Sequence, residues 1–323
     1  MTSRRQLLAL SAAAALPGLA WPQQFPSRPL KIVVPNAAGG AADITARTVG
    51  QRLSATLGQS VVIDNRPSAG GVVAGELVAR AEPDGHTLLL VSSGTAVTAA
   101  LFKALPFDTL ADFAPVSMLA TFDLGIVVAS GGRFNDLAQL LAWARANPGK
   151  LNIGTPNIGT TQHLAAELFK STAGIDAQVV PFNGTPPVIT ALRGGQIDAS
   201  IDILGPLMGQ IGSGALKPLA VLGANRAPQL REVPAARESG GPLASFDVSS
   251  WNGLAVPAKT PAAQVAVLNR HIVDALAQPD VKARLLELNL VAHSSTPAGL
   301  GAHLKADTER WVGVIARAKI PRQ

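Results

Sequence analysis

The chain of 323 residues contains no cysteine, which removes several kinds of site at once. Without thiols there is no disulfide framework, no thiolate metal centre and no cysteine nucleophile. Histidine is also scarce, with five in the chain, and no second histidine lies near His163 in the sequence. The sequence therefore predicts neither a metal site nor a cofactor.

Charged residues are few and unclustered. They make up 15% of the chain, with 27 basic and 21 acidic residues and a formal net charge of +6. No run of five or more basic residues occurs, whereas nucleic-acid-binding proteins normally show a clustered basic surface, so we expect no nucleic-acid partner. With 47% hydrophobic residues the chain is not of the disordered class, and it is long enough for two domains with their own cores.

Long apolar runs are missing beyond the N-terminus. Residues 1–20 have the layout of an export signal, with Arg4 and Arg5, apolar Leu7 to Leu16, and small residues ending at Ala20. The apolar run is too short for a permanent anchor, and a tethering helix or a disordered tail is the alternative. The paired arginines also resemble a twin-arginine signal. Because no later segment is suited to crossing a membrane, we expect a soluble protein exported to the periplasm.

Motifs for covalent catalysis are absent too. The chain has no Gly-x-Ser-x-Gly turn and no pair of carboxylates near a histidine, so we expect no catalytic residues and no enzyme. A serine does follow the apolar run 87–91, in the sequence Val91-Ser92-Ser93-Gly94. We interpret the serine in this turn as the source of a hydroxyl that binds a ligand.

The chain does contain an alternation of β-rich runs and helical patterns, which is typical of an α/β sheet. The expected strands are 30–34, 61–64, 87–91, 114–119, 124–128, 151–155, 178–180, 197–201, 218–222 and 252–256. The expected helices are 44–57, which Gly58 should end, 136–147, one opening at 159–163, 261–276, 280–288 and 297–319. Pro115 lacks the N–H that a central strand uses, so 114–119 is expected at a sheet edge.

The alternation starts twice, which predicts two lobes of similar design. We expect one lobe to comprise residues 21–123 and 247–323, and the other residues 124–246. The lone strand 252–256 returns the helical tail to the first lobe, so two strands cross between the lobes and form a hinge with a cleft beside it.

Two glycine-rich turns each join a strand to a helix, at residues 35–43 (PNAAGGAAD) and 155–163 (TPNIGTTQH). Such a turn presents free backbone N–H groups at the positive end of a helix, and these bind anions without a basic side chain. Since ligands of open α/β sheets lie outside the carboxyl ends of the strands, both turns are expected to face one cleft and to clamp a small anion.

Several ordered motifs resemble one family, the Bug/TctC receptors of tripartite tricarboxylate transporters. The resemblance covers nearly all of the chain after the leader and is carried by residues 35–43, 62–71 (VIDNRPSAGG), 83–89 (PDGHTLL), 112–116 (DFAPV), 159–169 (GTTQHLAAELF) and 249–258 (SSWNGLAVPA). It implies a two-lobed periplasmic-binding-protein fold of type II, the Venus-flytrap arrangement.

The resemblance also implies a ligand carboxylate held mainly by backbone N–H groups and waters from the two turns. The positions that carry over as ligand-binding are Asn36, Ala38, Gly40, Ala41, Ser93, Thr95, Asn157, Gly159, Thr160, Thr161, Gln162, His163, Asn183 and Asp202. This chain departs from the family at 36–38, where an aromatic residue and prolines are usual. It departs again at 182–184, where Tyr-Lys-Gly is usual and this chain, which has no tyrosine, has Phe-Asn-Gly.

Four of these positions, and Asp43 at the end of the first turn, have a structural alternative or a specific role. One of Thr160 and Thr161 is expected to cap its helix. His163 is expected to be structural or a neutral hydrogen-bond donor. Asp43, beside the first turn, is expected to hold the loop in shape. Asp202 ends an apolar strand and could accept a hydrogen bond from a hydroxyl or amine of the ligand.

Together these observations predict a monomeric periplasmic receptor that closes on a small organic carboxylate. The resemblance implies a two-component membrane permease as its partner. Two alternatives stay open: a sensor that reports ligand binding to a membrane signalling protein, and an enzyme that processes a carboxylate.

Overall fold

The computed structural model describes residues 25–318 and 320–323, so the export signal expected over 1–20 lies outside the described residues. The strands are β1 (Leu30–Val34), β2 (Val61–Asn65), β3 (Thr87–Ser92), β4 (Phe113–Ala129), β5 (Leu151–Thr155), β6 (Ala177–Pro181), β7 (Ala199–Ile203), β8 (Leu216–Val221), β9 (Ser249–Pro257) and β10 (Leu290–Ala292). No helix within the described ranges has the length and apolarity needed to cross a membrane.

The α-helices fill the connections between these strands and form the C-terminal tail. They are α2 (Ala41–Leu57), α3 (Val72–Ala79), α4 (Ser93–Leu101), α5 (Leu137–Ala146), α6 (Thr161–Ala173), α7 (Thr185–Arg193), α8 (Met208–Gly212), α9 (Ala262–Ala277), α10 (Pro279–Glu287) and α11 (Pro297–Arg317). Short 3-10 turns are η2 (Ala69–Gly71), η3 (Gly205–Leu207), η4 (Ala236–Ser239) and η5 (Gly241–Leu243). As expected, Gly58 ends α2 in the left-handed conformation, with φ of 65°.

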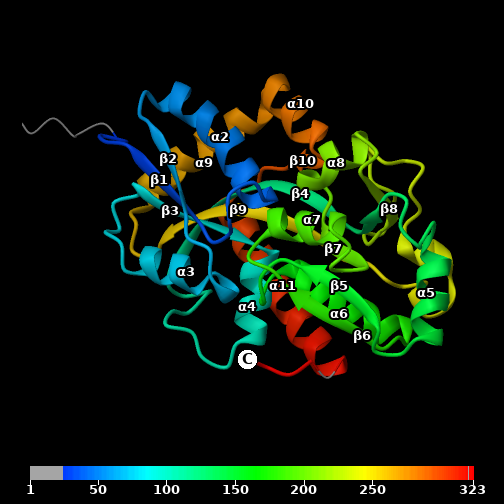
Figure 1. Cartoon of the computed structure of the whole chain (residues 1–323). Coiled ribbons are helices and arrows are strands. Elements are labelled where there is room, and N and C mark those ends of the chain that lie inside the picture. The colour runs from blue at the N-terminus through cyan, green and yellow to red at the C-terminus, as the bar shows by residue number, and fades with distance from the viewer. Residues whose placement is uncertain (1–24, 319) are drawn as a thin grey trace, which may run out of the picture.

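Two groups of parallel strands are joined through long antiparallel ones, in the order β2-β1-β3-β9-β4-β7-β5-β6. In the first group β1 pairs in parallel with β2 and β3, and in the second β5 pairs in parallel with β6 and β7. Strands β9 and β4 lie between the groups and run antiparallel to their neighbours. Figure 1 shows β1–β3 and β5–β8 on opposite sides of the molecule, with β4 and β9 between them.

The prediction of an edge strand at 114–119 is wrong, and so is its separation from 124–128. Both segments belong to β4, a single strand of 17 residues in the middle of the sheet. Pro115 is tolerated there because the β4–β9 register shifts between Pro115 and Ser117, so the ladder is already irregular at that point.

Strand β4 links the two lobes because its partner changes along its length. It pairs with β9 as far as Asp123, opposite Ser249, and with β7 from Leu124 onward. The chain returns beside this point, where the Val248 N–H donates to the Leu222 carbonyl at 2.7 Å. On this change of partner we propose the lobe division 21–123 with 247–323, and 124–246.

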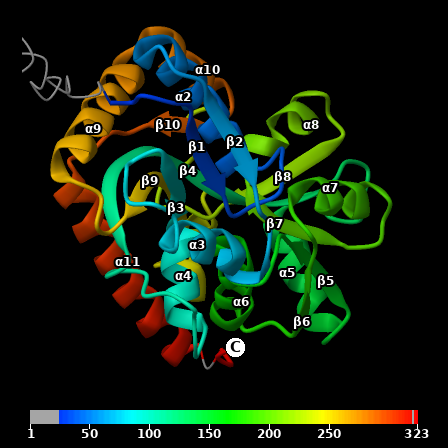
Figure 2. The same cartoon turned by 90° about the vertical axis from the view of Figure 1, so that its left-hand side faces the viewer.

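The C-terminal helices pack against elements from the first part of the chain. Helix α9 packs on α2 and β4, and α11 packs on α4 and β4. Figure 2 shows α9 and α11 along the outer side of the molecule. Trp311 of α11 is fully buried in the larger hydrophobic core, so the tail is an integral part of the fold.

Candidate functional site

The two glycine-rich turns meet at one cavity, as the sequence predicted. We call it the central cavity; its volume in this structure is about 50 Å³, room for a few water molecules. It is lined by Asn36, Ala37, Gly40, Ala41, Ala42, Ser92, Gly94, Phe122, Pro156, Asn157, Thr160, Thr161, Gln162, Gly184, Thr185, Ile203, Ser250 and Asn252.

Four helices begin at the wall of this cavity. Their N-cap residues are Gly40 of α2, Ser92 of α4, Thr160 of α6 and Gly184 of α7, and all four line it. The first N–H groups of a helix have no partner within the helix, and the helix dipole makes that end positive. None of the residues lining the cavity is Lys, Arg, His, Asp or Glu. The positive potential here therefore comes from backbone dipoles, which suits a small anion.

A buried acid outside the cavity holds the first turn in shape. Asp43 accepts a hydrogen bond from the Gly39 N–H at 2.9 Å and pairs with Arg47 at 2.9 Å. Burial raises the pKa of Asp43, but the hydrogen bonds from Arg47 and Gly39 outweigh it and hold the pKa below its ordinary value. Asp43 does not line the cavity, so the expected structural role is the one the geometry supports.

The second turn is organised by Thr160, which caps α6. Its hydroxyl accepts from the His163 N–H at 3.2 Å and donates to the Asn157 carbonyl at 2.8 Å. One of the two threonines is therefore a cap, as expected. The His163 side chain is buried and does not line the cavity. Burial lowers its pKa, which favours the neutral form of the ring.

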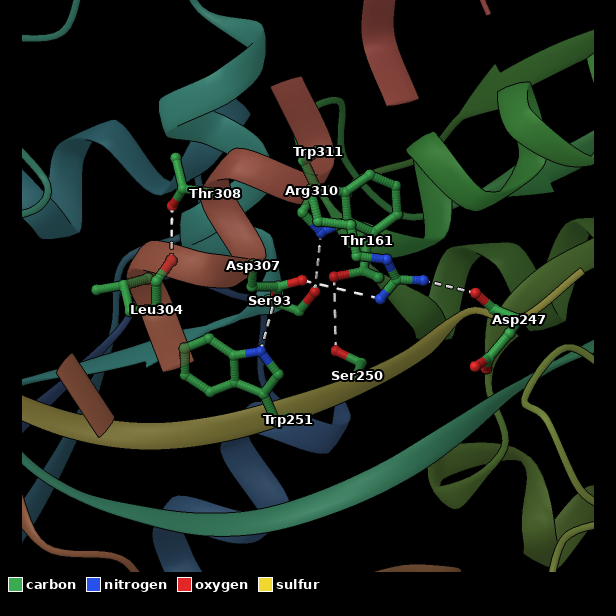
Figure 3. A network of polar contacts seen from close by, with 10 residues as sticks. All are labelled: Ser93, Thr161, Asp247, Ser250, Trp251, Leu304, Asp307, Thr308, Arg310 and Trp311. Carbon is green, nitrogen blue, oxygen red and sulfur yellow. Dashed lines mark hydrogen bonds and ion pairs between the residues drawn. The ribbon is translucent and has the colours of Figure 1, made fainter. Parts of the chain in front are cut away.

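At the end of β3 the hydroxyl that faces the cavity is that of Ser92, one position before the expected Ser93. Ser92 accepts from the Gly94 N–H at 3.1 Å, and its own N–H donates to the Thr95 hydroxyl at 3.0 Å. The Ser93 hydroxyl is buried and accepts from the Trp311 indole N–H at 3.4 Å (Figure 3). Ser93 thus supports the cavity wall from behind.

Helix α11 fixes the strand that forms the floor of the cavity. The Trp251 indole of β9 donates to Asp307 at 2.9 Å, and Arg310 donates to the Asp247 carbonyl at 2.6 Å, just before β9 (Figure 3). On the same strand the Ser250 hydroxyl lies 3.5 Å from that of Thr161, at the start of α6. These contacts connect α11, the segment before β9, and the cavity wall at Ser250.

Asp202 lies behind the cavity wall. It is fully buried, and its Oδ1 accepts from the Gln162 amide at 3.0 Å and from the Ile203 N–H at 2.7 Å. Burial raises its pKa to about 6, against the hydrogen bonds from Gln162 and Ile203, which lower it. Gln162 lines the cavity and Asp202 does not, so this acid acts on the cavity through the glutamine.

The structure places the predicted ligand-binding residues in three groups. Those that line the central cavity are Asn36, Gly40, Ala41, Asn157, Thr160, Thr161 and Gln162. Those that line only a smaller adjoining cavity are Thr95 and Gly159. Those that line neither are Ala38, Ser93, His163, Asn183 and Asp202. Ala38 and Asn183 are exposed, and their chain neighbours Ala37 and Gly184 face the central cavity instead.

Sequence reasoning missed the part of the wall that comes from the crossing strands. Phe122 of β4 and Ser250 and Asn252 of β9 line the cavity. A signal for the last two existed, since they lie in the motif 249–258 that carried the family resemblance.

The two lobes touch on both flanks of the cavity. The Gly70 N–H donates to the Ile158 carbonyl at 2.9 Å, and the Thr98 hydroxyl lies 3.0 Å from the Gly70 carbonyl and 3.1 Å from that of Gly159. On the other flank, a Cβ built on Gly184 would lie 2.8 Å from the Ala37 Cβ. The cleft is therefore closed in this structure.

The raised pKa of Asp202 predicts a specific pH dependence of stability. Between pH 3.8 and about 6 the native protein keeps a proton that the unfolded chain has released, so the free energy of unfolding falls as pH rises through this window. The loss is about 3 kcal/mol in all. Between pH 4 and pH 7, urea unfolding should show the wild type losing about 2 kcal/mol more stability than Asp202→Asn, because the other titrating acids are common to both proteins. Equal pH slopes in the two proteins would contradict it.

Comparison with known proteins agrees with this geometry. The family model described as "Tripartite tricarboxylate transporter family receptor" matches residues 45–319. Protein BugT of Bordetella pertussis is 32% identical over 320 residues, covering 98% of each chain. A protein of Pseudomonas sp. strain P51, named for the tcbD-tcbE intergenic region, is 38% identical over 296 residues, covering 92% of this chain and 88% of the relative.

Solved structures give the same result. The periplasmic binding protein BugD has a TM-score of 0.88 at 30% identity, covering 93% of this chain and all of that one. MatC of Rhodopseudomonas palustris, with bound malate, has a TM-score of 0.85 at 33% identity, covering 90% of this chain and 100% of that one. R. palustris Rpa4515, with adipate, has a TM-score of 0.88 at 31% identity, covering 92% of this chain and 99% of that one. The chain belongs to the receptor family of tripartite tricarboxylate transporters, whose members are two-lobed periplasmic solute-binding proteins and not enzymes.

Proposed function

We propose that this protein captures a small organic carboxylate in the central cavity and delivers it to a transporter of the tripartite tricarboxylate type. The observation that carries the proposal is the meeting of four helix N-termini around a cavity whose lining has no charged side chain. Similar proteins with adipate and with malate support it, because both ligands are carboxylates.

The chemistry of the cavity favours an anion held by dipoles. Hydrogen bonds from N–H groups to a carboxylate are stronger than those between neutral groups, and a site shielded from water strengthens them further. Gly40 caps α2 and Gly184 caps α7, and neither glycine makes a side-chain hydrogen bond to its helix. The first-turn N–H groups of α2 are therefore not taken up by a capping side chain. Pro186 and Pro187 have no N–H, so Thr185 is the main donor of the α7 start.

Binding is coupled to closure of the two lobes. The turn after β1 and the turn after β5 lie in different lobes, so a ligand that contacts both bridges the cleft. Such a ligand binds the closed form better than the open one and shifts the population toward it. Closure then presents a shape to the membrane partner that the free receptor rarely adopts.

The partner we propose is the two-component membrane permease of this transporter type, served by a monomeric receptor. We also propose that residues 1–20 direct export to the periplasm. These proposals rest on membership of the family and on the pattern of the first twenty residues.

A thermal-shift panel of mono-, di- and tricarboxylates, amino acids and aromatic acids tests the proposed function. A ligand at about 100 times its Kd stabilises the native state by about 2.7 kcal/mol, which raises Tm by several degrees. The control is Gly40→Leu, whose side chain would fill the cavity. A Cβ at Gly40 meets only the Ala37 carbonyl at 3.6 Å, so the fold tolerates it. We expect some carboxylates to raise the Tm of the wild type and not that of Gly40→Leu. The proposal would be contradicted if only compounds other than carboxylates raised the Tm, or if the same carboxylates also raised the Tm of the variant.

The closure mechanism is tested by Gly159→Ala. A Cβ there would lie 2.9 Å from the Gly70 Cα of the opposite lobe, so closure is blocked and ligand affinity should fall at least about tenfold. The matched control is Gly174→Ala at the other end of α6, which has a similar positive φ and no atom within 4 Å of the added Cβ.

Small-angle scattering of both variants, with and without the ligand found in the panel, gives the second readout. The ligand should reduce the radius of gyration of Gly174→Ala and leave that of Gly159→Ala unchanged. If both variants contract and bind alike, the Gly70–Gly159 approach plays no part in closure.

A further inference from the structure

Two side-chain amides in the wall of the central cavity have their NH2 groups engaged elsewhere. The Gln162 Nε2 donates to Asp202 Oδ1 at 3.0 Å, and the Asn252 Nδ2 donates to the Thr45 hydroxyl at 3.0 Å. Gln162 belongs to the first turn of α6 and Asn252 to β9, so the two amides reach the cavity from different elements.

The orientation of each amide follows from its partner. The Thr45 hydroxyl donates its one proton to the Ala41 carbonyl at 2.8 Å, so its oxygen can only accept from Asn252. An ionised Asp202 has no proton to donate, so it too can only accept, and it is fully buried with no basic side chain paired to it in the described part of the chain. Neither amide can turn its NH2 toward the cavity without breaking these bonds.

The oxygens of both amides are left without a protein partner. Neither Gln162 Oε1 nor Asn252 Oδ1 accepts a hydrogen bond from any group in residues 25–318 and 320–323, although the two residues are 8% and 1% exposed. Neither oxygen is fully enclosed by the protein, so each keeps accessible surface at which a ligand can donate a hydrogen bond to it. The cavity thus combines backbone N–H groups, which can donate to an anion, with two fixed amide oxygens, which can accept a hydrogen bond from a donor group.

We propose that the ligand is a carboxylate that carries a hydroxyl or ammonium group, and that this group donates to the oxygens of Gln162 and Asn252. The inference rests on the proposed function, since it assumes that a carboxylate occupies the helix N-termini. An unsubstituted acid leaves both oxygens unpaired. The buried charge of Asp202 behind Gln162 disfavours a second carboxylate at this end of the cavity and favours a donor.

Matched acids test this by isothermal titration at pH 7.5. The first series is propionate, lactate and alanine, and the second is succinate, malate and aspartate; members of a series differ only at the carbon beside the carboxylate. In at least one series a hydroxylated or aminated member should bind at least about tenfold more tightly than the unsubstituted acid, which leaves the two oxygens unpaired.

The variant Gln162→Met keeps the length of the side chain and removes the acceptor. It should reduce the preference at least about threefold, while Gln51→Met, the same change at an exposed position of α2, leaves it unchanged. Equal binding within both series, or a preference that survives Gln162→Met, overturns this inference and leaves the proposed function standing. If none of the six acids binds, the proposed function fails for these acids and the inference falls with it.

Discussion

The structure depends on one arrangement: four helix N-termini converge on the central cavity, and no residue that lines this cavity carries a charged side chain. Four helices begin at the central cavity, and their unpartnered N–H groups provide the positive potential. Helix starts can converge in this way only if the strands before them end at the same place. The two parallel strand groups, joined through β4 and β9, achieve this by facing their carboxyl ends toward one cleft.

Much of the surrounding structure keeps these helix starts in position. Asp43 and Arg47 shape the first turn, Thr160 shapes the second, and α11 fixes β9 through Trp251. Ionisation of the buried Asp202 lowers stability at neutral pH relative to its protonated form, yet its carboxylate fixes the amide of Gln162 at the cavity wall. A costly buried charge at a ligand cavity is typical of a group kept for function. Held in this way, the cavity can combine anion binding with selectivity.

The sequence predicted the local features well, because strand ends, turns and caps are determined by nearby residues. The turns 35–43 and 155–163, the Thr160 cap and the Gly58 end all followed from local chemistry. Prediction from the sequence failed where the local structure depends on contacts with residues far away in the chain. Pro115 suggested an edge, but a register shift against β9 accommodates it in a central strand. Which residue of a turn faces the cavity also depends on the opposite lobe, so Ser92, Ala37 and Gly184 were missed by one position each.

The most direct test of this account is a crystal structure with the carboxylate that gives the largest thermal shift. The account predicts both carboxylate oxygens about 3 Å from first-turn N–H groups of α2 and α6, those of Ala41, Ala42, Thr161 or Gln162. It also predicts no Lys, Arg or His side chain in contact with the carboxylate. A carboxylate paired with a basic side chain, or bound away from the helix N-termini, would contradict the central claim.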